Sequence, residues 1–195
     1  MIGGSAWSWY STTLEAHLLY SHNLDSAQTG LVFLTTALTY SLVSPVVGRL
    51  YDTGLGGFTL ISVGSGLVTL GFLAMGPGPL SSYLEVTVMS MGLQGVGFSL
   101  VYIGSLLTML GQLADCNLPE TEQCKGMVSS LWTVAVCLGQ AVGTSAGGFA
   151  YDRLGFEWGM LLEALIVFSS IVLVGGIRVF RQTTLKVAQI DKEIS

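Results

Sequence analysis

Two acidic side chains, Glu15 and Glu163, lie inside apolar stretches of this sequence. A carboxylate that faces lipid is costly, so acids inside apolar segments usually mark a cavity, an ion path or a proton relay. A carboxylic acid that is withdrawn from water also holds its proton more readily. Glu15 and Glu163 are therefore candidates for proton coupling. For each, the alternative is an interfacial residue whose side chain reaches water.

The stretch "TLEAHLLY" (13–20) sets the surroundings of Glu15. A helix over 3–21 places a polar stripe on one face, at spacings of three and four residues. The stripe consists of Ser8, Ser11, Thr12, Glu15 and His22. We expect it to face a bundle interior or an aqueous cavity. His17 lies about 200° round the helix from Glu15, so the two are not interpreted as a dyad.

Three aromatic side chains, Tyr40, Tyr102 and Trp132, fall in the middle of apolar runs. Aromatic residues of membrane proteins usually collect at the two interfaces instead. Mid-span rings could line a cation site by cation–π attraction, although plain packing is the commoner reason for them. The sequence offers no nucleophile–base pair, phosphate loop, metal-ligand cluster or basic patch. An enzyme, a cofactor, a metal site and a nucleic-acid partner are therefore not expected.

The composition shows which elements must position these residues. Hydrophobic residues make up 51% of the chain and charged residues 10%, whereas a soluble domain has about 25% charged residues. Since a membrane-spanning helix needs roughly 20 apolar residues, we predict an all-α membrane protein, a six-transmembrane-helix bundle over 1–181, with a cytoplasmic tail at 182–195. The predicted helices are 3–21, 27–49, 58–76, 84–112, 126–150 and 157–179. The first is the weakest, so either other helices shield it or the chain begins part-way through a longer helix.

The distribution of basic residues predicts an orientation. One set of loops and the tail hold Arg49, Lys125, Arg178, Arg181, Lys186 and Lys192, and the opposite loops hold only Arg153. By the positive-inside rule both termini are cytoplasmic. Cys116 and Cys124 then lie in a reducing compartment, where a disulfide between them is not expected.

Two glycine patterns concern the arrangement of the helices. "GRLYD" (Gly48, Arg49, Asp52) and "GFAYD" followed by Arg153 (Gly148, Asp152) lie 100 residues apart and are candidate gating-loop motifs. They suggest a 3+3 inverted repeat, a transporter signature, although such turn sequences also arise by chance. The four-residue spacing of Gly139, Gly143 and Gly147 predicts a ridge that another helix can approach closely.

Several longer stretches resemble a known family. They are "LEAHL" (14–18), "GLVFLTTALTYSLVSPVVGRLYD" (30–52), "VGFSLVYIG" (96–104) and "GMVSSLWTVAVCLGQAVGTSAGGFAYDRLGFEW" (126–158). They are similar to the C-terminal six-helix half of major facilitator superfamily transporters, within the vesicular amine transporter family and nearest its polyamine branch. The resemblance implies that Glu15 couples substrate to protons, with Ala16 in place of the family's usual Pro. The acids of the monoamine and acetylcholine branches match Gly104 and Thr133 here, which favours polyamine-like substrates.

The resemblance thus implies half of a proton-coupled antiporter of organic cations, located in a vesicle or another endomembrane. Its expected partners are membrane lipid, a small cationic solute, protons, and a missing N-terminal six-helix half or a full-length carrier. Two alternatives remain: a major facilitator carrier of another solute, and a truncated, non-transporting membrane protein that modulates a full-length carrier.

Overall fold

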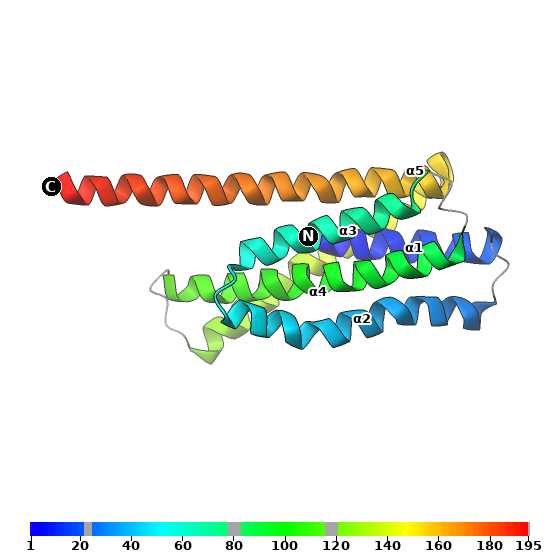
Figure 1. The fold of residues 1–195 in the computed structure, drawn as a ribbon, viewed down its shortest axis with the longest axis horizontal. Helices are drawn as coiled ribbons and strands as arrows, with labels where there is room; N and C mark the ends of the chain where they lie inside the picture. Colours follow the sequence, from blue (N-terminus) through cyan, green and yellow to red (C-terminus); the bar gives the residue numbers. More distant parts are fainter. Residues whose placement is uncertain (22–24, 78–82, 116–120, 195) are drawn as a thin grey trace.

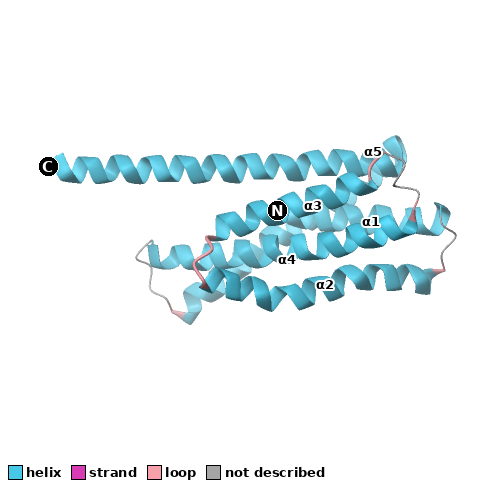
Figure 2. Ribbon diagram, in the orientation of Figure 1, coloured by secondary structure: helices cyan, strands magenta, loops and turns pink. Residues whose placement is uncertain are grey.

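The computed structural model describes residues 1–21, 25–77, 83–115 and 121–194. The regular structure of these residues is entirely helical (Figures 1 and 2). The helices are α1 (Ile2–Ser21), α2 (Ser26–Asp52), α3 (Gly57–Met75), α4 (Leu84–Asp115) and α5 (Glu122–Ile194). The predicted all-α bundle is confirmed, and Cys116 and His22 lie outside the described residues.

A sharp turn divides α5 at Gly155, where φ is 78° and ψ is 175°. Glycine adopts this backbone conformation at little cost because it has no β-carbon. The first segment of α5 (122–154) and the second segment (156–194) run in opposite directions, as Figure 1 shows. The described chain therefore contains six helical segments. The last one continues through Ile194 rather than ending near 179, because the stretch that follows contains good helix formers and neither Gly nor Pro.

Within the described parts of the chain, four helices are long and apolar enough to cross a membrane: Ser26–Asp52, Gly57–Met75, Leu84–Leu113 and Glu122–Gly176. Helix α1 is not among them. Its apolar side chains Ala6, Tyr10, Leu14 and Leu18 are nevertheless all buried against the other helices. This burial agrees with the first explanation for the weak apolar character of α1, namely that other helices shield it.

The predicted glycine ridge lies against α1. A β-carbon on Gly139 would collide with the backbone of Met1, directly before α1, and one on Gly143 with the Ser5 backbone in α1. One on Gly147 would stand 3.1 Å from the Trp9 Cα. Helix α1 packs mainly on α5, α2 packs on α4, and α3 packs on both α4 and α5. The ridge allows α1 and the first segment of α5 to approach almost backbone to backbone.

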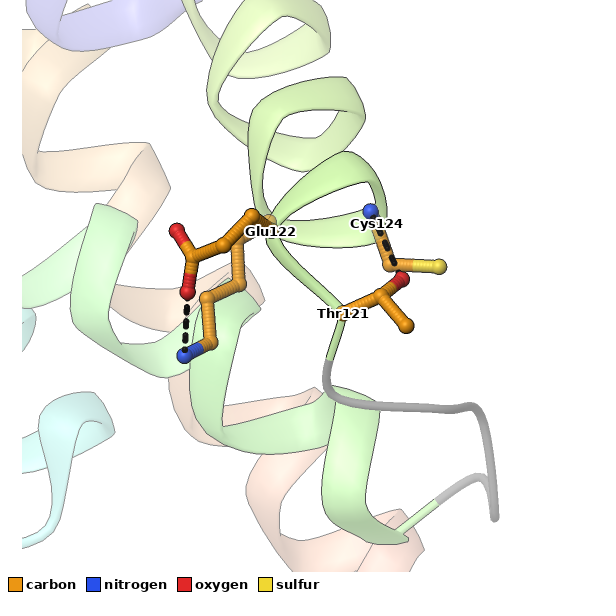
Figure 3. A network of polar contacts seen from close by, with 4 residues as sticks. Thr121, Glu122 and Cys124 are labelled. Carbon is orange, nitrogen blue, oxygen red and sulfur yellow. Dashed lines mark hydrogen bonds and ion pairs between the residues drawn. The ribbon is translucent and has the colours of Figure 1, made fainter.

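Short polar contacts define where two helices begin. Asp25 caps α2, since its carboxylate accepts from the Ser26 N–H (2.9 Å) while Gln28 Oε1 accepts from the Asp25 N–H (3.1 Å). At the start of α5 the Cys124 N–H donates to Thr121 Oγ1 at 3.4 Å, and the Lys125 ammonium lies 3.5 Å from the Glu122 carboxylate (Figure 3). The Ser26 and Cys124 contacts satisfy backbone N–H groups that the start of a helix leaves unpaired.

The chain directions fit an inverted repeat. Helices α1, α2 and α3 alternate in direction, and α4 with the two segments of α5 repeats the alternation in the opposite sense (Figure 1). The ends of α2 and α4 and the start of α5 lie at one end of the bundle, and the Gly155 turn lies at the other. Arg49 and Lys125 are therefore at the opposite end from Arg153.

The ridge can be tested with a matched pair of glycine variants. Gly143→Ala places a methyl group against the Ser5 backbone, whereas Gly148→Ala meets nothing within 4 Å. We expect Gly143→Ala to destabilise the detergent-solubilised chain by about 1–3 kcal/mol, measured as a lower melting temperature. Gly148→Ala should cause no loss. Equal melting temperatures would show that the α1–α5 contact tolerates a wider spacing.

Candidate functional site

Four aromatic side chains converge from four helices: Trp7 of α1, Tyr40 of α2, Tyr102 of α4 and Trp132 of α5. They line a cavity of about 350 Å³, here called the aromatic cavity. Its other lining residues are Ala37, Ser41, Val136 and Gln140. The structure thus brings together the three aromatic residues singled out in the sequence, and adds Trp7.

Tyr102 stands at the centre of this group. Its ring meets Tyr40 edge-on at 6.4 Å and 76° and Trp132 at 5.9 Å and 78°, a favoured geometry for aromatic pairs. The Tyr102 hydroxyl donates to the Gly3 carbonyl at 3.1 Å, and the Trp132 indole N–H donates to Ser105 Oγ at 2.9 Å. Because these polar atoms are already bonded, the two rings offer a ligand mainly their π faces, which attract cations.

A second cavity, also of about 350 Å³, lies among α1, α3, α4 and both segments of α5; we call it the inner cavity. It shares Tyr102, Trp132 and Val136 with the aromatic cavity. Its wall is mostly apolar, and its polar side chains include Ser65, Ser105 and Ser170. The Tyr102–Trp132 pair therefore forms part of the wall between the two cavities.

Glu15 is exposed on α1, so the described chain does not bury this carboxylate as expected. Trp7, Ser11 and Glu15 recur every four residues and share one side of the helix. Glu15 lies about 12 Å along α1 from Trp7, at 1.5 Å per residue. One side of α1 thus leads from the aromatic cavity to Glu15.

The rest of the predicted stripe divides between two environments. Thr12 is exposed, but Ser8 is buried, so the polar face is narrower than predicted. The His17 ring stacks on Phe156, with centroids 3.9 Å apart and planes at 5°. His17 therefore packs against the second segment of α5 and does not form a dyad with Glu15.

Glu163 lies inside the bundle with only 1% of its surface exposed. It shares its stretch of α5 with the buried Met160, Ala164 and Val167, and it does not line the aromatic cavity. Among the described residues, its Oε1 has no hydrogen-bond partner. Snorkelling to the interface is therefore not the arrangement seen. The two acids differ in kind: one is exposed and the other is enclosed.

The two candidate gating motifs lie at opposite ends of the bundle. Arg49 and Asp52 are exposed at the end of α2, and Asp152 and Arg153 are exposed just before the Gly155 turn. The Arg153 guanidinium lies 5.5 Å from the centroid of the Phe149 ring. A β-carbon added to Gly48 or Gly148, the glycines of these motifs, would have no described atom of another helix within 4 Å. Neither motif contributes to the two cavities described above.

Sequence reasoning did not single out Trp7 or Gln140 as cavity residues. Trp7 lies four residues before Ser11 on the same side of the helix, so the stripe itself could have indicated it. Gln140 lies eight residues, or about two helical turns, after Trp132 in α5. The two side chains therefore lie on the same side of α5, and this spacing could have indicated Gln140.

The sequence model of the Major Facilitator Superfamily matches residues 1–192, nearly the whole chain. The chain belongs to the Major Facilitator Superfamily. The six helical segments and their glycine-mediated packing agree with half of a major facilitator bundle.

Curated relatives narrow the family. Human MFS-type transporter SLC18B1 is 29% identical over 165 residues, which is 83% of this chain and 36% of that protein. The bovine synaptic vesicular amine transporter is 28% identical over 140 residues, 71% of this chain and 25% of that protein. Efflux pump radE of Floropilus chiversii is 31% identical over 84 residues, 43% of this chain and 15% of that protein. The resemblance to vesicular amine transporters is thus confirmed. The match covers about a third of the length of SLC18B1.

The aromatic cavity can be tested by binding alone. Tyr102→Phe keeps the ring and loses only the hydroxyl, whereas Tyr102→Leu removes the π face. We expect Tyr102→Leu to weaken binding of a quaternary ammonium probe by about 0.5–2 kcal/mol, roughly 2- to 30-fold in Kd, and Tyr102→Phe to retain affinity. Calorimetry on the detergent-solubilised chain measures both values. Equal affinities for the two variants would exclude the ring as a cation contact.

Proposed function

We propose that this chain forms the C-terminal half of a proton-coupled antiporter of organic cations, with polyamines as the substrate class. One observation carries the proposal: aromatic side chains from α1, α2, α4 and α5 line an open cavity beside the side of α1 that bears Glu15. Rings supply cation–π attraction and a carboxylate supplies charge and proton exchange, which together are the chemistry an amine substrate needs.

The spacing of these groups favours a flexible polycation over a monoamine. Trp7 and Glu15 are separated by about 12 Å along α1. An extended polyamine can place one ammonium group on the rings and another beside Glu15, whereas a compact monoamine reaches only one of them. The resemblance supports the same choice, because Gly104 and Thr133 stand where the monoamine and acetylcholine branches carry acids. A β-carbon on Gly104 would also lie 3.2 Å from the Leu60 Cβ, which leaves no open space for an acidic side chain.

Exchange follows from competition at Glu15. The deprotonated carboxylate attracts an ammonium group, and its protonation removes that attraction and releases the cation. With both termini cytoplasmic, the Glu15 end of α1 faces the opposite compartment, since it lies at the end away from Arg49 and Lys125. In a vesicle that compartment is the lumen, whose protons would displace the cation there.

The proposed carrier is completed by a second six-helix half. Helix α2 and the first segment of α5 expose many large apolar side chains, among them Leu38, Leu42, Leu131 and Leu138, which membrane lipid or a partner half would cover. That half is either the N-terminal half of the same carrier or part of a full-length carrier. The similarity to efflux pump radE keeps open the alternative of a major facilitator carrier for another solute.

Uptake measurements test the proposal. Vesicles that contain this chain and its complementary six-helix half should take up labelled spermidine when a proton gradient is imposed. We expect Glu15→Gln to reduce this uptake to background, because the amide binds neither the proton nor the ammonium charge. Glu85→Gln, at an exposed acid at the start of α4, should leave uptake unchanged.

The alternatives give different results in the same assay. Full uptake by Glu15→Gln would remove Glu15 from the mechanism. Proton-driven uptake of a labelled sugar or monocarboxylate, but not of labelled spermidine, would indicate another solute. Absence of uptake, together with co-purification of the chain with a twelve-helix carrier, would indicate a modulating protein instead of a transporter.

A further inference from the structure

Glu163 is the acid that the proposed cation pathway does not use. It is 1% exposed, and its Oε1 has no hydrogen-bond partner among the described residues. An ionised carboxylate in such a place is strongly disfavoured unless a counter-charge or several donors stabilise it. A neutral, protonated carboxyl group avoids this cost.

The ionisable groups on the surrounding helices do not supply a counter-charge. Helix α3 has no ionisable side chain between Gly57 and Met75. Near α1, the ionisable groups with described side chains are the Met1 amino group, Tyr10, Glu15 and His17. Helix α4 adds Glu85 and Tyr102. The rest lie on α5: Glu122, Cys124, Lys125, Cys137, Tyr151, Asp152, Arg153 and Glu157. Tyr10 is bonded to Thr36 at 3.0 Å, Tyr102 to Gly3, and His17 is stacked on Phe156. Lys125 and Arg153 are exposed at the two ends of the bundle.

One buried donor does lie near Glu163. The Trp9 indole N–H of α1 is also unpartnered among the described residues, and it stands 3.9 Å from the position a β-carbon on Gly159 would occupy. Gly159 is one helical turn before Glu163. Long helical side chains lie over the turn that precedes their own Cα, so the Glu163 side chain reaches toward the gap that Gly159 leaves for Trp9. Among the described residues, an unpaired donor (Trp9 Nε1) and an unpaired acid oxygen (Glu163 Oε1) thus both lie near Gly159.

The inner cavity reaches the same stretch of α5, although neither Glu163 nor Trp9 is part of its lining. Val167, one turn after Glu163, lines that cavity together with Ala6, Ser65 and Ser170. The cavity of about 350 Å³ has room for several waters, and its hydroxyls provide partners for them. Val167 thus places this water-sized space about one helical turn from Glu163.

We propose that Glu163 is an interior proton-binding site, separate from the aromatic cavity. The Trp9 indole N–H donates a hydrogen bond to the Glu163 carboxylate once the proton has left. The proton passes from the Glu163 carboxyl to a water in the inner cavity, and returns by the reverse step. As a step in transport this rests on the function proposed above, because protons are the coupled ion there. The binding site itself requires no transport.

Infrared difference spectroscopy on this chain in lipid nanodiscs measures the site directly. Raising the pH should abolish the carbonyl stretch of a protonated, buried carboxylic acid, and Glu163→Gln should lack that band from the start. Glu157→Gln, an exposed acid in the same helical segment, should keep it. Trp9→Phe removes the donor for the charged form, so the band should persist to a higher pH than in the unchanged chain.

Each outcome decides the proposal. No titrating band in the unchanged chain, or a band that survives Glu163→Gln, overturns the assignment. An unshifted titration in Trp9→Phe overturns the role of Trp9. If Glu163→Gln does not fold, Glu163→Asp keeps a carboxyl group and must displace the band. In the uptake assay, loss of proton-driven uptake in Glu163→Gln with unchanged spermidine binding supports coupling through this site. Normal uptake in Glu163→Gln would show that Glu163 has no part in transport and would leave the proposed antiporter function intact. Absence of uptake by the unchanged carrier would count against the antiporter function, but not against Glu163 as a proton-binding site.

Discussion

The close approach of α1 to α5 is the contact on which the rest of this bundle depends. Helix α1 is too polar to rank with the four candidate membrane spans, so it needs contact with other helices rather than with lipid. The ridge at Gly139, Gly143 and Gly147 provides that contact without intervening side chains. In lipid, where apolar side chains gain little from leaving the solvent, such close backbone packing is a main source of helix association. The position of every functional candidate on α1 follows from this contact.

The Gly155 turn extends the same contact to a second surface. It reverses α5, so that α1 lies against the first segment through the ridge and against the second through Phe156 and Gly159. Trp9 shows the consequence most clearly. Its indole ring lies 3.2 Å from a β-carbon position on Gly147 and 3.9 Å from one on Gly159, which places a large ring between the two segments. Two glycines on two helical segments thus create the space for one tryptophan.

The sequence was sufficient for the helices and the glycine ridge, because runs of apolar residues and four-residue spacings are local signals. It singled out Tyr40, Tyr102 and Trp132 as mid-span aromatic residues, but only the structure brings them to one cavity. It was not sufficient for the environments of the two acids. The sequence left both acids open between a bundle interior or cavity and the membrane interface, whereas in the structure Glu15 is exposed and Glu163 is enclosed. Burial of a helical residue depends on which neighbour covers that face. Here the neighbour of Glu163 is set by the turn at Gly155 and by α1, more than 140 residues earlier in the chain.

The shared wall gives the two proposed sites a physical means of coupling. Tyr102 and Trp132 line the inner cavity together with Val167, which lies one turn after Glu163. A cation bound on the two rings can therefore act on Glu163 through its electric field without touching it. Opposite unit charges about 10 Å apart attract by roughly 1.7 kcal/mol at an effective dielectric constant of about 20, which exceeds a tenfold change in an equilibrium constant. A nearby cation favours the charged form of a carboxylic acid, so a bound amine would promote release of the Glu163 proton. That sign is the one that an antiporter requires, since binding of one ion must expel the other.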